Sequence, residues 1–286
     1  MNFDGFSMYM PLESDKIASL KDVTKAEDVG FGIVKRRLEV KTKEQEETCG
    51  RRIGVYATYD FKDNVYTSMR AAKTMENLLV SAVRSFVGAS ASCVLVVGLG
   101  NGNIAADSLG TKVFAKIDVS GQNNEKCSHK PRVMCISTSV FGQTGIQSAE
   151  LVFAVVKHIK PSCVVLVDSL ATASCGRVCR CFQLSTAGIT PGGGVGNDTS
   201  RIDKDLLGVP VLAIGVPTLV TFPNVVYGAV KEYVENKGCK IDEYLVRSVM
   251  ADEKLSGMVV APKNVDAEVE NASVLISNAL NLAFAR

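Results

Sequence analysis

Four short apolar runs constrain the fold of this chain more than any other feature of its sequence. They lie at residues 93–97, 133–137, 163–167 and 211–216. Runs of this length are typical of strands that are buried on both faces of a parallel sheet. The sequence therefore predicts a central sheet that contains these four strands.

Segments with helical periodicity lie between and beyond these runs. Residues 70–87 and 146–159 predict helices, and Thr144 followed by Gln147 predicts a capping box before the second. A final helix is predicted after a capping Asn264. Alternating strands and helices are typical of an α/β fold, with a largely parallel sheet and helices on both faces. Residues 51–60 and 181–184 predict two further strands.

Composition and charge indicate a soluble globular protein. The 286 residues are 47% hydrophobic and 22% charged, with a net charge of +2 and no sustained basic block. We therefore expect neither a nucleic-acid nor a membrane partner. The first residues lack a secretory signal, and no apolar run approaches the ~20 residues that span a bilayer, so a cytoplasmic location is expected.

The nine cysteines are typical of reduced thiols, since their number is odd and several lie inside apolar runs. Cys175, Cys179 and Cys181 form a cluster whose spacing matches no standard zinc site, and neither histidine is paired with it. We expect no metal and no cofactor. Residues 1–50 are polar and highly charged, which indicates an N-terminal extension or edge subdomain before a single α/β domain over residues 51–286.

Two aspartates are the strongest candidates for chemistry. Asp168 directly follows the apolar run 163–167, and Asp107 lies shortly after the run 93–97. Ligands of open α/β sheets bind beyond the carboxyl ends of the strands, although a helix N-cap explains the position of Asp168 equally well. Two carboxyls in one cleft ionise unequally, which suits one as general acid and its partner as the activator of water. From the residues alone, two unrelated surface acids remain the simpler interpretation.

Two glycine-rich segments have competing interpretations. Residues 98–103, Gly-Leu-Gly-Asn-Gly-Asn, follow a predicted strand as in a dinucleotide site, with Asp118 downstream, but the third glycine of that motif is absent. Residues 188–197 contain Gly192, Gly193 and Gly194, whose backbone N–H groups are suited to hold an oxyanion or a substrate carbonyl. A surface loop is the plain alternative for the second segment.

Taken together, six sequence blocks resemble the germination protease family of endospore-forming bacteria, over roughly residues 50–286. In order they are GLGNGNIAADSLG, VFGQTGIQSAELV, VDSLAT, STAGITPGGGVGN, LGVPVLAIGVPTLV and MVVAPKNVDAEVENASVLISNALNLA. The resemblance implies a three-layer α/β/α sandwich like that of the hydrogenase-maturation peptidases. It also implies a cytoplasmic, homotetrameric endopeptidase of the spore core that cleaves small acid-soluble spore proteins during germination.

The resemblance also implies roles for individual residues. Asp107 and Asp168 match the two essential aspartates of the family, which would share a proton and activate water without a covalent intermediate. Asn101, Asn103 and the glycines at 192–194 become candidates for a substrate or oxyanion loop. A zymogen segment of about residues 1–16 is expected, with its cleavage region at Asp15, Lys16 and Ile17.

The chain departs from the family pattern near the proposed cleft. The family usually has Trp at Gly102, Pro at Ala106, Asp at Thr186 and His at Thr190. These differences leave two alternatives beside the spore endopeptidase. One is a maturation-type peptidase that clips a single partner protein, and the other is a protein-binding homologue that has lost catalysis.

Overall fold

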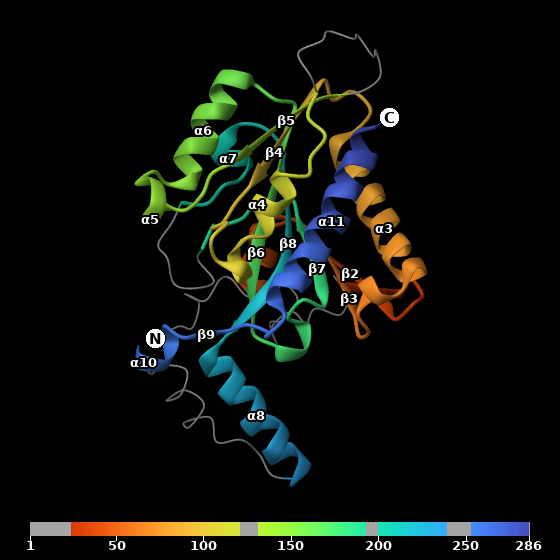
Figure 1. Cartoon of the computed structure of the whole chain (residues 1–286), viewed down its shortest axis with the longest axis vertical. Helices are drawn as coiled ribbons and strands as arrows, with labels where there is room; N and C mark the ends of the chain where they lie inside the picture. The colour runs from red at the N-terminus through yellow and green to blue at the C-terminus, as the bar shows by residue number, and fades with distance from the viewer. Residues whose placement is uncertain (1–23, 121–130, 193–199, 239–252, 286) are drawn as a thin grey trace.

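A computed structural model describes residues 24–120, 131–192, 200–238 and 253–285. Its centre is a nine-stranded sheet with the order β1-β2-β3-β7-β8-β6-β4-β5, in which β9 also pairs with β8 (Figure 1). The first strands are β1 (Thr24–Asp28), β2 (Ile33–Val40), β3 (Gly54–Phe61), β4 (Cys93–Gly98) and β5 (Arg132–Ser137). They are followed by β6 (Cys163–Thr172), β7 (Cys181–Ser185), β8 (Val211–Thr221) and β9 (Val259–Val260).

The half of the sheet formed by β5, β4, β6 and β8 is parallel, and it contains the four strands predicted from the apolar runs. Successive side chains of these strands enter two different cores. In β4, Val94 and Val96 join the larger hydrophobic cluster, whereas Leu95 and Val97 join the smaller one on the opposite face. Such strands lack a polar face, which is why they read as continuous apolar runs.

The other half of the sheet is antiparallel. β7 pairs with β8, β3 with β7, β2 with β3, and β1 with β2, all in antiparallel register. The predicted α/β fold is confirmed, but the sheet is mixed and not largely parallel as predicted, because β1, β2, β3 and β7 extend it in antiparallel register. The strands β1 and β2 come from the highly charged segment before residue 51 and form one edge of this same sheet.

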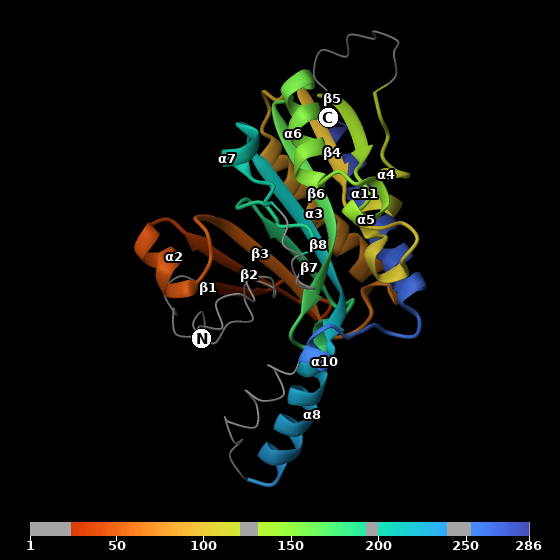
Figure 2. The same cartoon turned by 90° about the vertical axis from the view of Figure 1, so that its left-hand side faces the viewer.

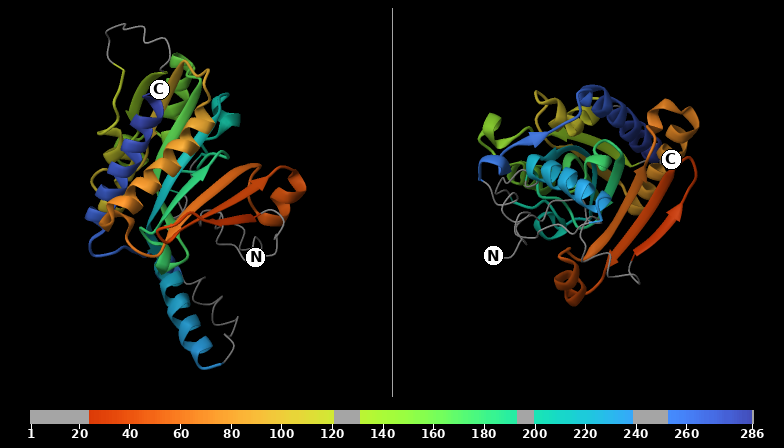
Figure 3. Two further views of the ribbon diagram at one scale, coloured as in Figure 1. Left: turned by 90° about the vertical axis from the view of Figure 1, so that its right-hand side faces the viewer. Right: turned by 90° about the horizontal axis from the view of Figure 1, so that it is seen from below.

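Helices cover both faces of the parallel half. One face carries α3 (Met69–Val87), α4 (Leu109–Phe114) and α11 (Val265–Phe284), whose buried side chains share the larger cluster. Figure 3 shows α3 and α11 side by side on this face. The opposite face carries α6 (Ser148–Ile159) and α7 (Lys204–Leu207), and Figure 2 shows both lying against the parallel strands. The apolar residues at helical spacing in α3 and α11, such as Met75, Leu79, Val269 and Ile276, are buried in this cluster.

The remaining elements lie at the periphery. They are α2 (Lys43–Cys49), α5 (Phe141–Thr144), α8 (Phe222–Asn236), α10 (Glu253–Ser256) and the short 3₁₀ turns η2 (Val65–Thr67), η3 (Ala105–Asp107) and η4 (Cys175–Arg177). α8 projects from the end of β8 away from the sandwich (Figure 1). Within the described residues, no helix is both long enough and apolar enough to span a bilayer.

One predicted helix start differs from the structure, and a second has the predicted position but lacks its capping bond. Gly145, with φ 68°, ends the separate short helix α5, so the predicted box of Thr144 and Gln147 does not form and α6 begins only at Ser148. The capping box of α6 instead joins Gln147 and Glu150. Asn264 occupies the N-cap position of α11 but makes no capping bond; its amide donates to Glu268 Oε1 at 3.2 Å.

Helix α4 packs directly on the ends of β4 and β6 through backbone contact. A Cβ atom at Gly98 would lie 2.2 Å from the Gly110 carbonyl oxygen. A Cβ atom at Gly110 would lie 2.3 Å from the Leu99 carbonyl oxygen and 2.5 Å from that of Val167. Since real Cβ atoms do not approach backbone atoms so closely, only glycine permits this packing.

We expect Gly110→Ala to destabilise the protein by about 1–3 kcal/mol, because the added methyl group must push α4 off the sheet. Gly228→Ala in α8 is the matched control, since a Cβ atom there meets nothing within 4 Å. It should stabilise the protein by about 0.5–1 kcal/mol through helix propensity. Urea unfolding of both variants measures the two effects, and equal stabilities would contradict the close approach of α4.

Candidate active site

Asp168 lies on β6 just beyond the end of β4. From this residue on, β6 has no strand neighbour on the side of β4. The last β4–β6 pair is Gly98 with Val167, and the Leu99 N–H donates to the Val167 carbonyl at 2.9 Å. β6 then continues to Thr172 beside β8, with Asp168 opposite Gly215. The prediction that the strand itself ends at Asp168 is therefore wrong, because β8 continues the pairing after β4 has left.

The Asp168 carboxyl is buried, with the residue only 4% exposed. One of its oxygens, Oδ1, accepts a hydrogen bond from the Ser169 N–H at 2.9 Å. Burial and the nearby charge of Asp107 raise the pKa of Asp168 well above its usual range. This carboxyl therefore favours its protonated form.

Asp107 ends the 3₁₀ turn η3, which lies between β4 and α4. Its Oδ2 accepts a hydrogen bond from the Asn101 N–H at 2.8 Å. Gly100, with φ 95°, allows this close approach, since a Cβ atom there would lie 2.2 Å from the Asp107 carbonyl oxygen. Desolvation raises the pKa of Asp107, while the bond from Asn101 opposes that shift.

Thr218 of β8 fixes η3 above the sheet. Its hydroxyl is buried and donates to the Ala106 carbonyl at 2.5 Å. The turn that carries Asp107 is thereby bonded to the strand next to Asp168. Sequence reasoning missed Thr218, because a contact between residues so far apart in the chain leaves no local pattern.

The two aspartates form an electrostatically coupled pair, since the charge of Asp107 contributes to the raised pKa of Asp168. Coupled carboxyls lose their protons in two separate steps, so one stays protonated while the other is ionised. Such a pair is equipped to donate one proton and accept another. Among the described residues, no group of three or more His, Cys, Asp or Glu side chains is arranged to hold a metal ion.

Of the other predicted site residues, Asn101 and Asn103 lie in the turn beside Asp107, and only Gly192 of the three loop glycines is described. Asn101 Oδ1 accepts from the Asn103 N–H at 3.0 Å and from Gln143 Nε2 at 2.9 Å, so its side chain organises the turn beside Asp107. Gly192 is described and has φ 68°. Gly193 and Gly194 lie outside the described residues, as do Asp15, Lys16 and Ile17.

Three of the positions that depart from the family pattern have clear structural contacts. Gly102 faces Thr111, whose Cγ2 would lie 3.0 Å from an added Cβ atom. Ala106 supplies its carbonyl to Thr218. Thr186 Oγ1 accepts from the Val55 N–H at 2.9 Å, which fastens the loop after β7 to the start of β3.

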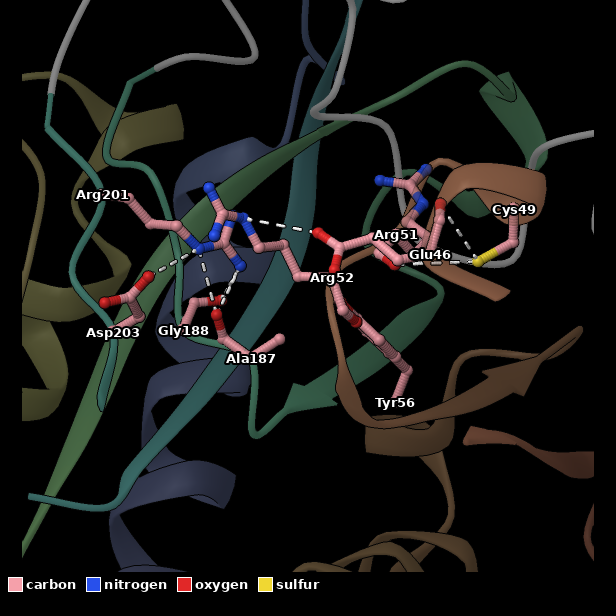
Figure 4. A network of polar contacts seen from close by, with 9 residues as sticks. All are labelled: Glu46, Cys49, Arg51, Arg52, Tyr56, Ala187, Gly188, Arg201 and Asp203. Carbon is pink, nitrogen blue, oxygen red and sulfur yellow. Dashed lines mark hydrogen bonds and ion pairs between the residues drawn. The ribbon is translucent and has the colours of Figure 1, made fainter. Parts of the chain in front are cut away.

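A polar network lies beside that loop (Figure 4). Arg201 Nε donates to the Ala187 carbonyl at 3.0 Å and lies 3.4 Å from Asp203 Oδ2. Tyr56 donates its hydroxyl to the Arg52 carbonyl at 2.8 Å, and burial raises the pKa of Tyr56 to about 12. These bonds fix the backbone around Ala187 at the junction of the antiparallel strands and the loop.

We expect Asp168→Asn to stabilise the protein at neutral pH. The pKa of Asp168 is higher in the folded protein than in the unfolded chain, where it is about 3.9. The folded state therefore loses stability as the pH rises from the pKa of the unfolded chain through that of the folded protein. Asn carries no charge and avoids this loss. Melting temperatures measured across acidic and neutral pH should show a gain of about 2–4 °C for each kcal/mol relieved.

The pH dependence distinguishes this effect from a change in packing. The gain from Asp168→Asn should disappear at a pH below the unfolded pKa, where both proteins are uncharged at this position. Asp118→Asn, at an exposed position, is the control and should show no comparable gain. A gain for Asp168→Asn that persists unchanged at low pH would contradict the buried charge.

Comparisons with known proteins identify the family of this chain. The family model described as germination protease matches residues 8–244. The germination protease of Clostridium perfringens strain SM101 is 30% identical over 86% of this chain and 82% of its own length. That of Caldanaerobacter subterraneus is 31% identical over 88% of this chain and 85% of its own length.

The solved structure of the NiFe hydrogenase maturation protease HycI from Thermococcus kodakarensis is also similar, with 14% identity and a TM-score of 0.38. That match covers 70% of this chain and 98% of the other. The family model and the two sequence relatives span most of the chain, including both aspartates. The chain therefore belongs to the germination protease family.

Proposed function

We propose that this protein is an endopeptidase that degrades small acid-soluble spore proteins during germination, with Asp107 and Asp168 as its catalytic pair. Membership of the germination protease family indicates a peptidase. The observation that carries the proposal is the placement of both acids at the end of β4, where Thr218 bonds the turn of Asp107 to the strand beside Asp168. The charge of Asp107 also raises the pKa of Asp168. Acid proteolysis needs such a pair.

The proposed reaction uses the unequal protonation of the two acids. Asp168 holds the proton because its carboxyl is the more deeply buried, and Asp107 is ionised. Asp107 accepts a proton from a water molecule as the water oxygen attacks the carbonyl carbon of the scissile peptide bond. Asp168 then gives its proton to the leaving amide nitrogen as the C–N bond breaks. The proton taken up by Asp107 passes to Asp168 and restores the pair.

The remaining parts of the proposal extend the resemblance to the family beyond the peptidase activity. The protein would act in the cytoplasm of the spore as a homotetramer and would use no cofactor. Its N-terminal extension, residues 1–50, would precede the peptidase domain proposed for residues 51–286 in the chain and add β1 and β2 to the edge of its sheet. A zymogen segment would be removed near Asp15, Lys16 and Ile17, which lie outside the described residues.

Digestion of a purified small acid-soluble spore protein tests the catalytic pair. The full chain and a chain that starts at Ile17 are compared with Asp107→Asn and Asp168→Asn forms of each. We expect either substitution to lower kcat by about 10²–10⁴-fold, because each removes one proton transfer. Asp118→Asn is the matched control, since this exposed aspartate lies outside the site.

The possible outcomes separate the alternative functions. Cleavage that survives both substitutions would exclude the aspartate mechanism. Tight binding of the spore protein by the parent without cleavage would favour a protein-binding homologue. Cleavage restricted to one folded partner protein would favour a maturation-type peptidase.

Thr218→Val should lower kcat by about tenfold with little change in KM, because the turn that carries Asp107 loses its bond to β8. The pH–rate profile should also shift, since the position of Asp107 affects the pKa of Asp168. Thr218→Ser keeps a hydroxyl and should retain most of the activity. A Val variant that is as active as the parent would show that the Thr218 bond does not position Asp107.

A further inference from the structure

The side chain of Leu170 lies in a space that a glycine leaves open on the sheet. Across β6 and β8, which run side by side in Figure 2, Asp168 pairs with Gly215 and Leu170 pairs with Pro217. A Cβ atom at Gly215 would lie 2.5 Å from Leu170 Cδ1 and 2.6 Å from its Cγ. The Leu170 side chain therefore occupies the space of a side chain opposite Asp168, and we call this space the Gly215 notch.

This position shows that Leu170 leans along β6 toward Asp168. Successive side chains of a strand alternate between its two faces, so Leu170 and Asp168 project from the same face. An upright Leu170 side chain would stand beside Pro217, its partner in the register, and not over Gly215. The lean brings Cδ1 into the row of Asp168 on the neighbouring strand, and neighbouring strands lie about 4.8 Å apart.

The exposure of these residues is that expected when an apolar side chain covers a carboxyl. Asp168 is only 4% exposed and Gly215 is buried, whereas Leu170 is half-buried. Asp168 is this well covered although β4 has ended and β6 has lost one strand neighbour. An apolar side chain in the adjacent space removes water from the carboxyl, which disfavours its charged form.

Gln183 supplies an independent observation that the notch excludes water. It pairs with Gly215 from the β7 side, so Asp168, Gly215 and Gln183 form one row across the sheet. Gln183 Oε1 is buried, and no residue in the described part of the chain donates a hydrogen bond to it. Because solvent does not reach this oxygen either, the row is dry on both sides of Gly215.

Few charged groups act on Asp168. Burial is the largest influence on its pKa, which it raises. Among the described residues, the Asp107 carboxyl of η3 raises that pKa further, and the Ser169 N–H of β6 opposes the shift. Gly215 of β8 and Gln183 of β7 carry no charge, and β4 ends before this row. Access of water to the carboxyl is therefore the influence that one apolar side chain controls.

We propose that Leu170, held in the Gly215 notch, is a positioning residue that keeps water away from the Asp168 carboxyl. The inference rests on the proposed peptidase function and deepens it, because a carboxyl that keeps its proton can give it to the leaving amide nitrogen. Leu170 touches no reacting atom in this scheme and acts through Asp168. Position 215 requires glycine, since a Cβ atom there would displace the leucine side chain.

The titration of Asp168 in the folded protein tests the inference without any substrate. Carbon-13 NMR follows the side-chain carboxyl groups with pH, and Asp168→Asn identifies the Asp168 signal. We expect Leu170→Ala to lower the titration midpoint of Asp168 by about one pH unit or more, because water then reaches the carboxyl. Leu170→Met fills a similar volume and should keep the midpoint of the parent.

Two further variants separate the notch from a general loss of packing. Gly215→Ala should also lower the midpoint, because its methyl group displaces Leu170. The double variant with alanine at both positions should titrate nearer to the parent than either single variant, since the new methyl group fills part of the emptied notch. Leu78→Ala is the matched control, because this partly buried leucine packs on the core from α3, and it should not move the midpoint.

Thermal melting checks that each variant is folded. A folded Leu170→Ala protein whose Asp168 titrates at the same pH as the parent would overturn the inference, as would an equal shift in Leu78→Ala. In the Asp107→Asn background, Leu170→Ala should still lower the midpoint of Asp168. Loss of the shift there would show that Leu170 acts through Asp107 and would also overturn the inference.

Digestion of the spore protein separates this inference from the proposed function. If Asp168 donates the proton, cleavage is lost as the pH rises through its pKa, so Leu170→Ala should move this limb of the pH–rate profile to lower pH. Above both limbs the rate should fall about tenfold for each pH unit of the move. A shifted NMR midpoint with an unshifted limb would support the role of Leu170 and exclude Asp168 as the proton donor.

The opposite result, a shifted limb with an unshifted midpoint, would overturn the inference. If the parent cleaves nothing, the peptidase function fails, and the NMR titration still decides whether Leu170 shields Asp168.

Discussion

The candidate site depends on the direct backbone contact between helix α4 and the ends of β4 and β6. Gly98 and Gly110 permit this contact, because a side chain at either position would overlap a carbonyl group. The contact ends β4 at Gly98 and places the loop with Asp107 over the neighbouring strand. β6 therefore continues past β4, and the first residue beyond the shared pairing is Asp168. The same contact of α4 with the sheet therefore determines the positions of both acids.

The protein buries two acids at this point although burial disfavours their charge. Main-chain N–H groups of Asn101 and Ser169 offset part of the cost by donating to the carboxyl oxygens. The remaining cost appears as a raised pKa, which is the property that lets an acid donate a proton near neutral pH. Burial of the two acids thus lowers the stability of the folded protein and also raises the pKa values on which the proposed proton transfers depend.

Sequence patterns predicted the parallel half of the sheet well, since strands such as β4 and β6 are buried on both faces and must be apolar throughout. The end of β6 was missed because its last residues are held by pairing with β8, which no local pattern records. The antiparallel arrangement was not foreseen, since β3 pairs with the distant strand β7 and no local pattern records that pairing. The sequence pattern made both aspartates candidates for the site but not Thr218, since its contact forms only once β8 and η3 are brought together.

The departures from the family pattern are compatible with an intact aspartate pair, because the contacts that hold the acids are largely made by the main chain. Asp107 is held through the Asn101 N–H and the Ala106 carbonyl, and Asp168 through the Ser169 N–H. A change from Pro to Ala at position 106 leaves that carbonyl in place. Among the positions that differ, Gly102 faces Thr111 and Thr186 accepts from the Val55 N–H, and neither contact involves the two acids. These main-chain contacts therefore do not depend on which side chains occupy the positions that depart from the family pattern.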